Sequence, residues 1–302
     1  MRRGKGVVSF LLYLWQIDVT EKLNFSEKGK AWLQFFRIGG VTSALSGSLW
    51  GHLIENQGMV SWLSVIPLLA VSFCIYLFGM GLNDLVDLRK DRELRSGRPL
   101  PSGRLGEGEA RKVCYVILLI GCLVMYAFLE EFQVWCFSLA FIFVTIYNLK
   151  AKHSRVYGPI TVALARSFNV MAGMTLLKYE LMPLAAFHFV HTLGIFVVAE
   201  GEDRESPLGW KKLSFLGVVP LLMFWKEPYA GILWAASLVW ITRDFWGTQA
   251  RSSAARLVGG LVGAFTLMEA CYLLGSEYWI PGLIFVGLYG VGRKLQKTFP
   301  AG

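Results

Sequence analysis

The stretch AVSFCIYLFGMGLNDLVDLRKD, residues 70–91, joins an apolar run to a cluster of three carboxylates. Its first half is nearly free of polar side chains, so we expect the acidic cluster where a membrane segment ends. Continued as a helix, Asp84, Asp87 and Asp91 fall at i, i+3 and i+7, on one face. Three carboxylates on one face repel one another unless something positive binds between them. Carboxylate oxygens with room for water and phosphate suit Mg²⁺, whereas the alternative is a solvated helix end.

The composition around this stretch is that of a membrane protein. Of the 302 residues, 55% are hydrophobic and 17% are charged, whereas soluble domains carry about a quarter charged residues. Stretches that approach the length of a roughly 30 Å hydrocarbon core recur along the whole chain. The sequence therefore predicts an all-α, polytopic bundle with membrane segments at 31–54, 59–82, 111–129, 132–148, 158–178, 181–199, 212–225, 229–243, 256–274 and 278–292.

The distribution of charge sets the orientation of this bundle. With the N-terminus inside and each segment crossing once, 26 of the 30 Lys and Arg residues lie in inner loops and tails or at the inner ends of the segments. Lys178 and Lys226 fall outside, and Arg37 and Arg166 lie within segments. This positive-inside pattern fits ten crossings, and it argues that the net charge of +9 does not serve nucleic-acid binding. The longer, charged loops are the inner ones, so we expect the active site on the inner side, near 83–110, 148–157 and 200–212.

The first thirty residues differ from the rest. Met1 to Arg3 are basic, and an apolar run ending at Trp15 follows, but no small-residue cleavage site is present. We therefore expect residues 1–30 to form an uncleaved cytoplasmic or interfacial segment, and residues 31–302 to form the transmembrane domain.

Ionisable residues within the segments are candidates for function, because each costs about 2.5–3.5 kcal/mol on insertion scales. Arg166 lies well inside its segment, with Asn169 close to the same face, and a structural pair with Glu269 is the alternative. Arg37 lies nearer a membrane end, where its side chain reaches the interface by snorkelling in the alternative interpretation.

Two histidines, His188 and His191, lie at i and i+3 in the sixth segment. Such a pair acts as an acceptor base, binds a metal, or packs in the core with hydrogen bonds. Packing is favoured, because no third ligand is evident.

The acidic cluster and the loop after it resemble a known family signature. Asn83-Asp84-x-x-Asp87-x-x-x-Asp91, followed by the run from Arg98 to Arg104 (RPLPSGR), is similar to the UbiA superfamily of intramembrane prenyltransferases. The resemblance extends over the transmembrane part, and the tail after residue 256 is most similar to a bacterial subgroup, the EboC-like proteins. The further matching positions are Tyr147, Lys150, Lys152, Gly158, Pro159, Arg166 and Asn169.

The resemblance implies a transmembrane bundle of nine to ten helices around a central cavity open to the cytoplasmic side. The family has nine helices, whereas the charge bias favours ten. It also implies a multi-pass protein, which we expect in a bacterial inner membrane. Two Asp-rich motifs hold an isoprenoid diphosphate through Mg²⁺ in this family. The second motif is altered here, because its place after the sixth segment holds Glu200-x-x-Asp203 in place of the usual aspartates.

Roles follow from the resemblance residue by residue. The catalytic candidates are Asn83, Asp84, Asp87 and Asp91. The metal-ligand candidates are Asp84, Asp87, Asp91, Glu200 and Asp203. The candidates for binding the diphosphate are Arg95, Arg98, Tyr147, Lys150, Lys152, Arg166 and Asn169, although a positive-inside anchor is the alternative for each basic one.

The function implied is Mg²⁺-dependent transfer of an isoprenoid chain from a prenyl diphosphate to a lipophilic or aromatic acceptor. The partners expected are the prenyl diphosphate, an unknown hydrophobic acceptor and membrane lipids, with no nucleic acid. The altered second motif keeps open a catalytically altered lipid-binding protein or transporter. Phosphatidyl-alcohol transfer is disfavoured, because the Asp-Gly start of that family's motif is absent.

Overall fold

The computed structural model describes residues 27–199, 215–243 and 251–299, with side chains from residue 257 onward in the last range. All regular structure in these residues is helical, which confirms the all-α prediction. The α-helices are α3 (Glu27–Phe35), α4 (Val41–Glu55), α5 (Trp62–Leu94), α6 (Glu107–Phe128), α7 (Glu131–Leu149), α8 (Tyr157–Met171), α9 (Met182–Ala199), α11 (Val218–Lys226), α12 (Pro228–Thr242), α13 (Arg251–Gly275) and α14 (Trp279–Thr298).

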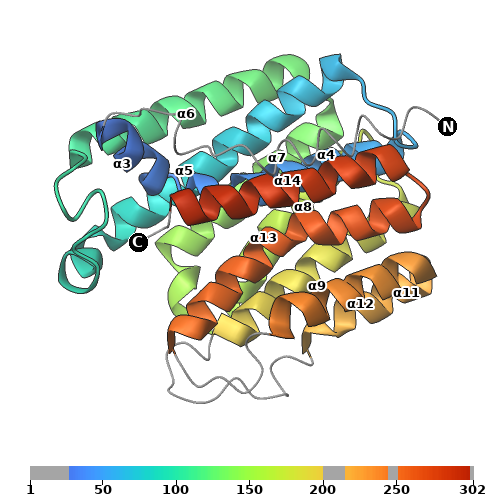
Figure 1. The fold of residues 1–302 in the computed structure, drawn as a ribbon. Helices are drawn as coiled ribbons and strands as arrows, with labels where there is room; N and C mark the ends of the chain where they lie inside the picture. The colour runs from blue at the N-terminus through green and yellow to red at the C-terminus, as the bar shows by residue number, and fades with distance from the viewer. Residues whose placement is uncertain (1–26, 200–214, 244–250, 300–302) are drawn as a thin grey trace.

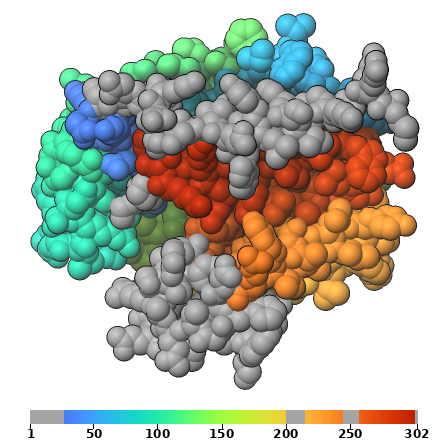
Figure 2. All heavy atoms as spheres, in the orientation of Figure 1, coloured from blue at the N-terminus to red at the C-terminus, as the bar shows by residue number. Residues whose placement is uncertain are grey.

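The helices form a bundle in which helices adjacent in sequence mostly pack together. The pairs α5 with α6, α7 with α8, α8 with α9, and α13 with α14 make the largest contacts, and α4 packs against α5, α8, α13 and α14 (Figure 1). In the space-filling view, α14 crosses the middle of the visible face, and α12 lies below it (Figure 2). The position of α4 at the centre of the bundle brings it to the wall of the cavity described below.

Five of the described helical segments are long and apolar enough to cross a membrane: Trp62–Leu94, Glu107–Phe128, Glu131–Leu149, Tyr179–Ala199 and Leu257–Gly275. The outer face of α6 exposes Leu119, Leu123 and Phe128, each by 59% or more. A wide apolar face of this kind is stable against lipid and costly against water. The chain is therefore a multi-pass membrane protein, while the number of crossings, the inner orientation and the bacterial location stay predictions. Residues 1–26 of the predicted interfacial segment lie outside the described residues.

The second predicted segment, 59–82, is longer than expected, because α5 continues to Leu94. At 1.5 Å per residue, its 33 residues span about 50 Å, whereas the hydrocarbon core is about 30 Å thick. The last turns of α5 therefore project beyond the apolar layer. This confirms that the acidic cluster is helical, and the length of α5 agrees with its predicted place at the end of a membrane segment.

The first predicted segment, 31–54, is not one helix. The chain turns at Arg37, whose φ of 46° and ψ of 50° are left-handed, and a short 3-10 helix, Ile38–Gly40, leads into α4. Gly39 lies against α14, where a Cβ would come within 2.7 Å of the Cα of Gln296. The prediction of a continuous helix is wrong because this close approach and the turn before it take the place of one helical turn.

The fifth predicted segment, 158–178, ends early, at Met171. The reason is a backbone crossing between α4 and the end of α8. A Cβ on Gly51 would collide with the carbonyl oxygen of Val170, and one on Gly173 would collide with that of Ser48. The chain then turns, and the Glu55 carboxylate accepts a 2.8 Å hydrogen bond from the backbone N–H of Thr175.

We expect Gly173→Ala to lower the free energy of unfolding by about 1–3 kcal/mol, because the backbone of α4 must move to admit the methyl group. Thermal unfolding of the purified protein in detergent measures the change. Gly108→Ala is the matched control, because nothing lies within 4 Å of its added Cβ. Equal melting temperatures for the two variants would contradict the close crossing of α4 and α8.

Candidate functional site

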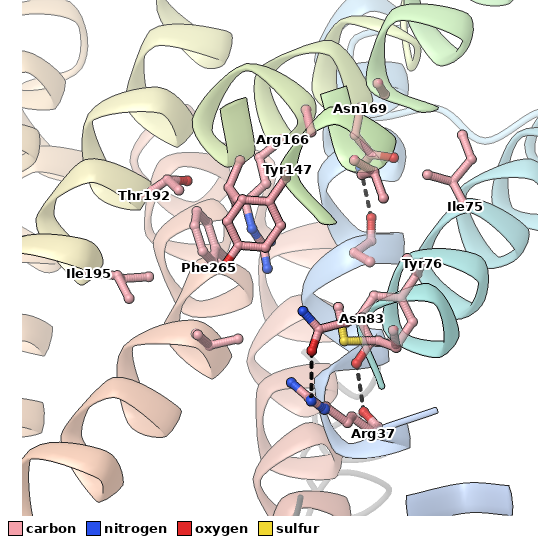
Figure 3. A pocket seen from close by; sticks show the side chains of 18 of the residues that line it. Arg37, Ile75, Tyr76, Asn83, Tyr147, Arg166, Asn169, Thr192, Ile195 and Phe265 are labelled. Atoms are coloured by element: carbon pink, nitrogen blue, oxygen red, sulfur yellow. Dashed lines mark hydrogen bonds between the residues drawn. The ribbon is translucent and has the colours of Figure 1, made fainter. Parts of the chain in front are cut away.

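A cavity of about 400 Å³ lies in the bundle, with walls from α4, α5, α7, α8, α9 and α13. Most of its lining is apolar, including Ile75, Val144, Ile195, Val262 and Phe265. Its polar lining residues are Arg37, Ser72, Tyr76, Asn83, Tyr147, Asn148, Arg166, Asn169 and Thr192 (Figure 3). A mainly apolar cavity with a few convergent polar groups is typical of a small-molecule site.

One stripe of α5 connects this cavity to the acidic cluster. Tyr76, Met80 and Asn83 line the cavity and lie at i, i+4 and i+7. Asp87 is the next position of the same stripe, one turn beyond Asn83. The end of the cavity near Asn83 is hereafter called the mouth, and the carboxylates follow it on the same helix.

Asn83 and Arg37 form the mouth together. The Asn83 amide donates a 2.9 Å hydrogen bond to Oδ1 of Asn148 on α7. The Arg37 guanidinium donates to Oδ1 of Asn83 at 3.2 Å (Figure 3). It also donates to Oδ1 of Asp84 at 2.6 Å. The sequence indicated Arg37 as a candidate for function, with snorkelling as the alternative, but no specific role in the site, and it did not single out Asn148. A signal for Arg37 was present, since a charge inside an apolar segment precedes two glycines.

The left-handed turn places Arg37 at the mouth, and Tyr76 holds that turn. The Tyr76 hydroxyl donates a 2.6 Å hydrogen bond to the backbone carbonyl of Arg37. A Cβ on Gly40 would come within 2.6 Å of the same hydroxyl, so the glycine makes room for Tyr76. A non-glycine residue in the left-handed region costs about 1–2 kcal/mol, and the Tyr76 bond helps to offset this cost.

Arg98 lies between two of the three carboxylates. Its Nη1 is 2.7 Å from Oδ2 of Asp91 and 3.5 Å from Oδ1 of Asp84, and all three side chains are buried. The loop that carries Arg98 folds back on itself, because Ser102 Oγ donates to the Arg98 carbonyl at 2.7 Å. The Arg95 side chain, by contrast, is 57% exposed, and its Nη1 makes a longer contact of 3.8 Å with Oδ1 of Asp91. Of the two predicted arginines, the structure thus brings Arg98 into the cluster and leaves Arg95 at its edge.

The third carboxylate, Asp87, has a different partner. Lys152 lies in a short 3-10 helix after α7, Ala151–His153, and its Nζ is 2.6 Å from Oδ1 of Asp87. The Lys152 side chain is 8% exposed and that of Asp87 is 21% exposed. Tyr147 lines the cavity nearby on α7, whereas Lys150 is exposed at the end of that helix.

The predicted metal ligands can be tested for fit by their oxygens. Asp84 and Asp87 carry hard oxygen donors next to the mouth, which suit Mg²⁺ together with phosphate oxygens. The oxygens of Asp91 face Arg98 at 2.7 Å and Arg95 at 3.8 Å, and Oδ1 of Asp84 faces Arg37 at 2.6 Å and Arg98 at 3.5 Å, so each of these two carboxylates has two protein cations beside it. Among the described residues, no three His, Cys, Asp or Glu side chains converge on one point. Glu200 and Asp203 lie outside the described residues.

The remaining predicted residues lie deeper. Arg166 and Asn169, on one face of α8, line the cavity and not its mouth (Figure 3). Asn169 donates to the Ala44 carbonyl at 2.8 Å and accepts from Ser72 Oγ at 2.8 Å, which joins α8 to α4 and α5. The predicted role of Arg166 and Asn169 in diphosphate binding stays a prediction.

The two histidines are buried and packed. His188 Nε2 lies 2.9 Å from Oε1 of Glu269, and its ring stacks on Trp50. His191 Nε2 lies 3.1 Å from the backbone carbonyl of Leu261. These contacts fit the interpretation of packed, hydrogen-bonded histidines. Glu269 thus contacts His188, and it also interacts electrostatically with Arg166 at a distance beyond 4.0 Å, so the predicted pairing of Arg166 with Glu269 stays open.

Replacing Arg98 tests whether the ion cluster supports the fold. We expect Arg98→Gln to lower the free energy of unfolding by about 3–5 kcal/mol, because it leaves the buried carboxylates of Asp84 and Asp91 without their shared cation. Arg95→Gln, at an exposed position, should change it by about 0.5 kcal/mol or less. Chemical or thermal unfolding in detergent compares the two variants, and equal stability would contradict the structural role of Arg98.

Comparison with known proteins adds a family match. Residues 44–207 match the model of the UbiA prenyltransferase family. The chain is 27% identical over 186 residues to a protein named digeranylgeranylglyceryl phosphate synthase from Methanocaldococcus jannaschii, an alignment covering 60% of this chain and 65% of that protein. It is 29% identical over 150 residues to a protein of the same name from Methanococcus maripaludis, covering 48% and 52%. The chain thus spans about half to two thirds of the length of the curated relatives it matches.

Solved structures show a similar fold. A UbiA homolog from Archaeoglobus fulgidus bound to GPP and Mg²⁺ has a TM-score of 0.62 at 17% identity, covering 82% of this chain and 98% of that one. A structure described as digeranylgeranylglyceryl phosphate synthase in membranes has a TM-score of 0.60 at 21% identity, covering 84% and 100%. These relatives leave the similarity to the EboC-like subgroup a prediction.

Proposed function

Because the chain belongs to the UbiA prenyltransferase family, we propose that it moves an isoprenoid chain from a prenyl diphosphate to a lipophilic or aromatic acceptor in the membrane. The reaction we propose is Mg²⁺-dependent and takes place at the mouth of the cavity. The observation that carries the proposal is the cluster of Arg37, Arg98 and Lys152 on the carboxylates Asp84 and Asp87, beside the mouth of an apolar cavity.

The charges of this cluster suit a diphosphate. Three carboxylates, Asp84, Asp87 and Asp91, have four cations within 4.0 Å. Each close contact between Arg37, Arg98 or Lys152 and its carboxylate is a charge-assisted hydrogen bond, and such a donor serves a phosphate oxygen equally well. A diphosphate at the mouth would therefore find its donors already desolvated and held in place.

The exposure of each cation indicates which side chains donate hydrogen bonds to the diphosphate. Arg37 is 26% exposed and lines the cavity, so its guanidinium reaches a ligand at the mouth most directly. Lys152 pairs with Asp87, so both cations lie near the end of the stripe on α5. Arg98 is held by Asp91, whose proposed role is to position it.

Asp84 and Asp87 would hold the Mg²⁺, and Asn83 orients Arg37 beside them. When bound, Mg²⁺ would supply Lewis-acid stabilisation of the charge on the diphosphate. A UbiA homolog bound to GPP and Mg²⁺ supports this pairing of ligands for the present chain.

The transfer itself is a substitution at the first carbon of the prenyl chain. The bond between this carbon and the diphosphate oxygen breaks, and the oxygen keeps the electron pair while Arg37, Arg98 and Lys152 donate to it. The acceptor nucleophile forms the new bond and releases its proton. The apolar walls exclude water, and ring faces such as Tyr147 and Phe265 suit positive charge on the prenyl carbon.

A second candidate is a catalytically altered lipid-binding protein or transporter. The observation that favours it is the set of ion pairs between the first motif and the protein's own cations, which is stable without further ligands. Binding of prenyl diphosphate without transfer to any acceptor in a broad panel would support this candidate over the enzyme.

Asp87→Asn provides the main test of the enzyme. We expect it to reduce Mg²⁺-dependent transfer from geranylgeranyl diphosphate at least 100-fold, because a proposed metal ligand and the partner of Lys152 is lost. Release of labelled diphosphate measures the rate, and chelation of Mg²⁺ should reduce the wild-type rate to the same level. Glu93→Gln is the control, because Glu93 is an exposed carboxylate on the same helix. An Asp87→Asn variant with full activity would contradict the proposal.

Tyr76→Phe tests the placement of Arg37. Loss of the bond to the Arg37 carbonyl frees the left-handed turn, so we expect the Kd for prenyl diphosphate to rise about 3- to 10-fold. In the background of Arg37→Gln, the same substitution should have no further effect, because its action runs through Arg37. Tyr115→Phe, on the exposed face of α6, is the control. An undiminished effect in the double variant would contradict this account.

A further inference from the structure

Arg104 lies at the end of the RPLPSGR run, and its side chain links three parts of the chain around Arg98. We propose that Arg104 is a positioning residue, which holds the loop of residues 95–106 so that the Arg98 guanidinium stays in place for a diphosphate. This loop joins α5 to α6 and is hereafter called the Arg98 loop. The inference rests on the proposed function and deepens it, because it gives a role to a residue beyond the ion cluster.

The Arg104 guanidinium donates to three oxygens. Its Nη2 donates to the backbone carbonyl of Gly97 at 2.8 Å, and its Nε donates to Ser102 Oγ at 3.2 Å. Its Nη1 donates to Oε1 of Gln34 on α3 at 2.8 Å. All three acceptors are neutral, and Glu27 of α3 adds an electrostatic attraction. The planar guanidinium thus links the loop to α3 through directed hydrogen bonds.

Two of these contacts lie on either side of Arg98. Gly97, whose carbonyl accepts from Arg104, is the residue directly before Arg98. Ser102 Oγ, which also accepts from Arg104, donates to the Arg98 carbonyl at 2.7 Å. The peptide groups before and after Arg98 are therefore both linked to Arg104, the first directly and the second through Ser102.

The third contact joins the Arg98 loop to a helix on which the loop already packs. Apolar side chains of the loop and of α3 are buried in one cluster, which includes Leu100, Leu105, Ala31 and Phe35. Gln34 adds a polar contact beside this apolar one. It precedes residues 44–207, which match the family model, so the contact between Arg104 and α3 is a feature of this chain that the match does not cover.

The ion pairs of Arg98 indicate when the support from Arg104 matters. In the structure, two carboxylates hold the Arg98 guanidinium, Asp91 at 2.7 Å and Asp84 at 3.5 Å. In the proposed complex Asp84 binds Mg²⁺, so Arg98 keeps only Asp91 while it donates to a phosphate oxygen. A loop ordered in advance lowers the entropy cost of that step. Arg104 should therefore affect the affinity for a diphosphate more than the stability of the fold.

Binding of geranylgeranyl thiodiphosphate to the purified full-length chain in detergent, with Mg²⁺ present, tests the inference. We expect Arg104→Gln to raise the Kd about 5- to 20-fold, because hydrogen bonds that order the loop are lost. The Kd for geranylgeraniol, which has no diphosphate, should not change. The melting temperature should stay within about 3 °C of the wild type, because Arg104 is exposed on a loop.

Three further variants separate positioning from charge. Arg104→Lys keeps the positive charge but cannot reach three oxygens at once, so its Kd should be close to that of Arg104→Gln. Gln34→Leu removes the contact with α3 alone, and it should raise the Kd about 2- to 5-fold, with no further effect in the Arg104→Gln background. Arg111→Gln is the matched control and should bind as the wild type does, because it removes an exposed arginine whose partner, Glu107, lies on the same helix.

Several results would overturn the inference. An unchanged Kd in Arg104→Gln is one. Wild-type affinity in Arg104→Lys, or an equal loss in Arg111→Gln, is another, because charge alone would then explain the effect. A parallel loss of geranylgeraniol binding or of thermal stability would show that Arg104 supports the bundle as a whole and does not position Arg98.

The outcomes also distinguish this inference from the proposed function. Mg²⁺-dependent transfer by the wild type, with an unchanged Kd in Arg104→Gln, would overturn the positioning role while the prenyltransferase proposal stands. The expected loss of affinity in Arg104→Gln, without transfer to any acceptor by the wild type, would support the positioning role and contradict the enzyme.

Discussion

The interaction on which this site depends is the contact of the Arg98 guanidinium with Asp91 and Asp84. Two carboxylates buried on one helix repel each other and lose their hydration, so they need a cation between them. Arg98 supplies it at 2.7 Å and 3.5 Å. The loop after α5 must fold back to bring Arg98 there, and this requirement explains why a proline- and glycine-containing run follows the acidic cluster directly.

Cations from distant parts of the chain meet these carboxylates near the C-terminal end of α5. Arg37 arrives through the left-handed turn before α4, and Lys152 arrives from the turn after α7. Asn83 links these parts, because its amide bonds to Asn148 on α7 while its oxygen accepts from Arg37. The carboxylates therefore hold the cations by ion pairs, and the cations are in place for a phosphate ligand at the mouth.

Much of the fold could be predicted because the apolar segments are long. Breaks that are acidic, basic or rich in glycine separate these segments. Each of the ten expected segments overlaps an α-helix of the structure. The break at Arg37 and the early end of α8 could not be predicted from periodicity, because backbone crossings at Gly39 and Gly173 with other helices cause them. Close approach between helices is a tertiary property that a local pattern does not contain.

The site, too, could be predicted only in part. The signature from Asn83 to Asp91 placed the carboxylates on a helix end, but it did not indicate that Asp87 faces Lys152 while Asp84 and Asp91 share Arg98. The roles of Arg37 and Asn148 in the site were missed because they arise from contacts across 46 and 65 residues. The second predicted motif, Glu200 to Asp203, lies outside the described residues, so its part in the site stays a prediction.

We propose that the C-terminal end of α5 binds Mg²⁺ and a diphosphate together. Titration of the purified protein with a non-hydrolysable prenyl thiodiphosphate, at fixed ionic strength with and without Mg²⁺, tests it most directly. The account predicts binding that is at least tenfold tighter with Mg²⁺, because the ion joins Asp84 and Asp87 to the phosphate oxygens. Equal affinity in the presence and absence of Mg²⁺ would contradict it.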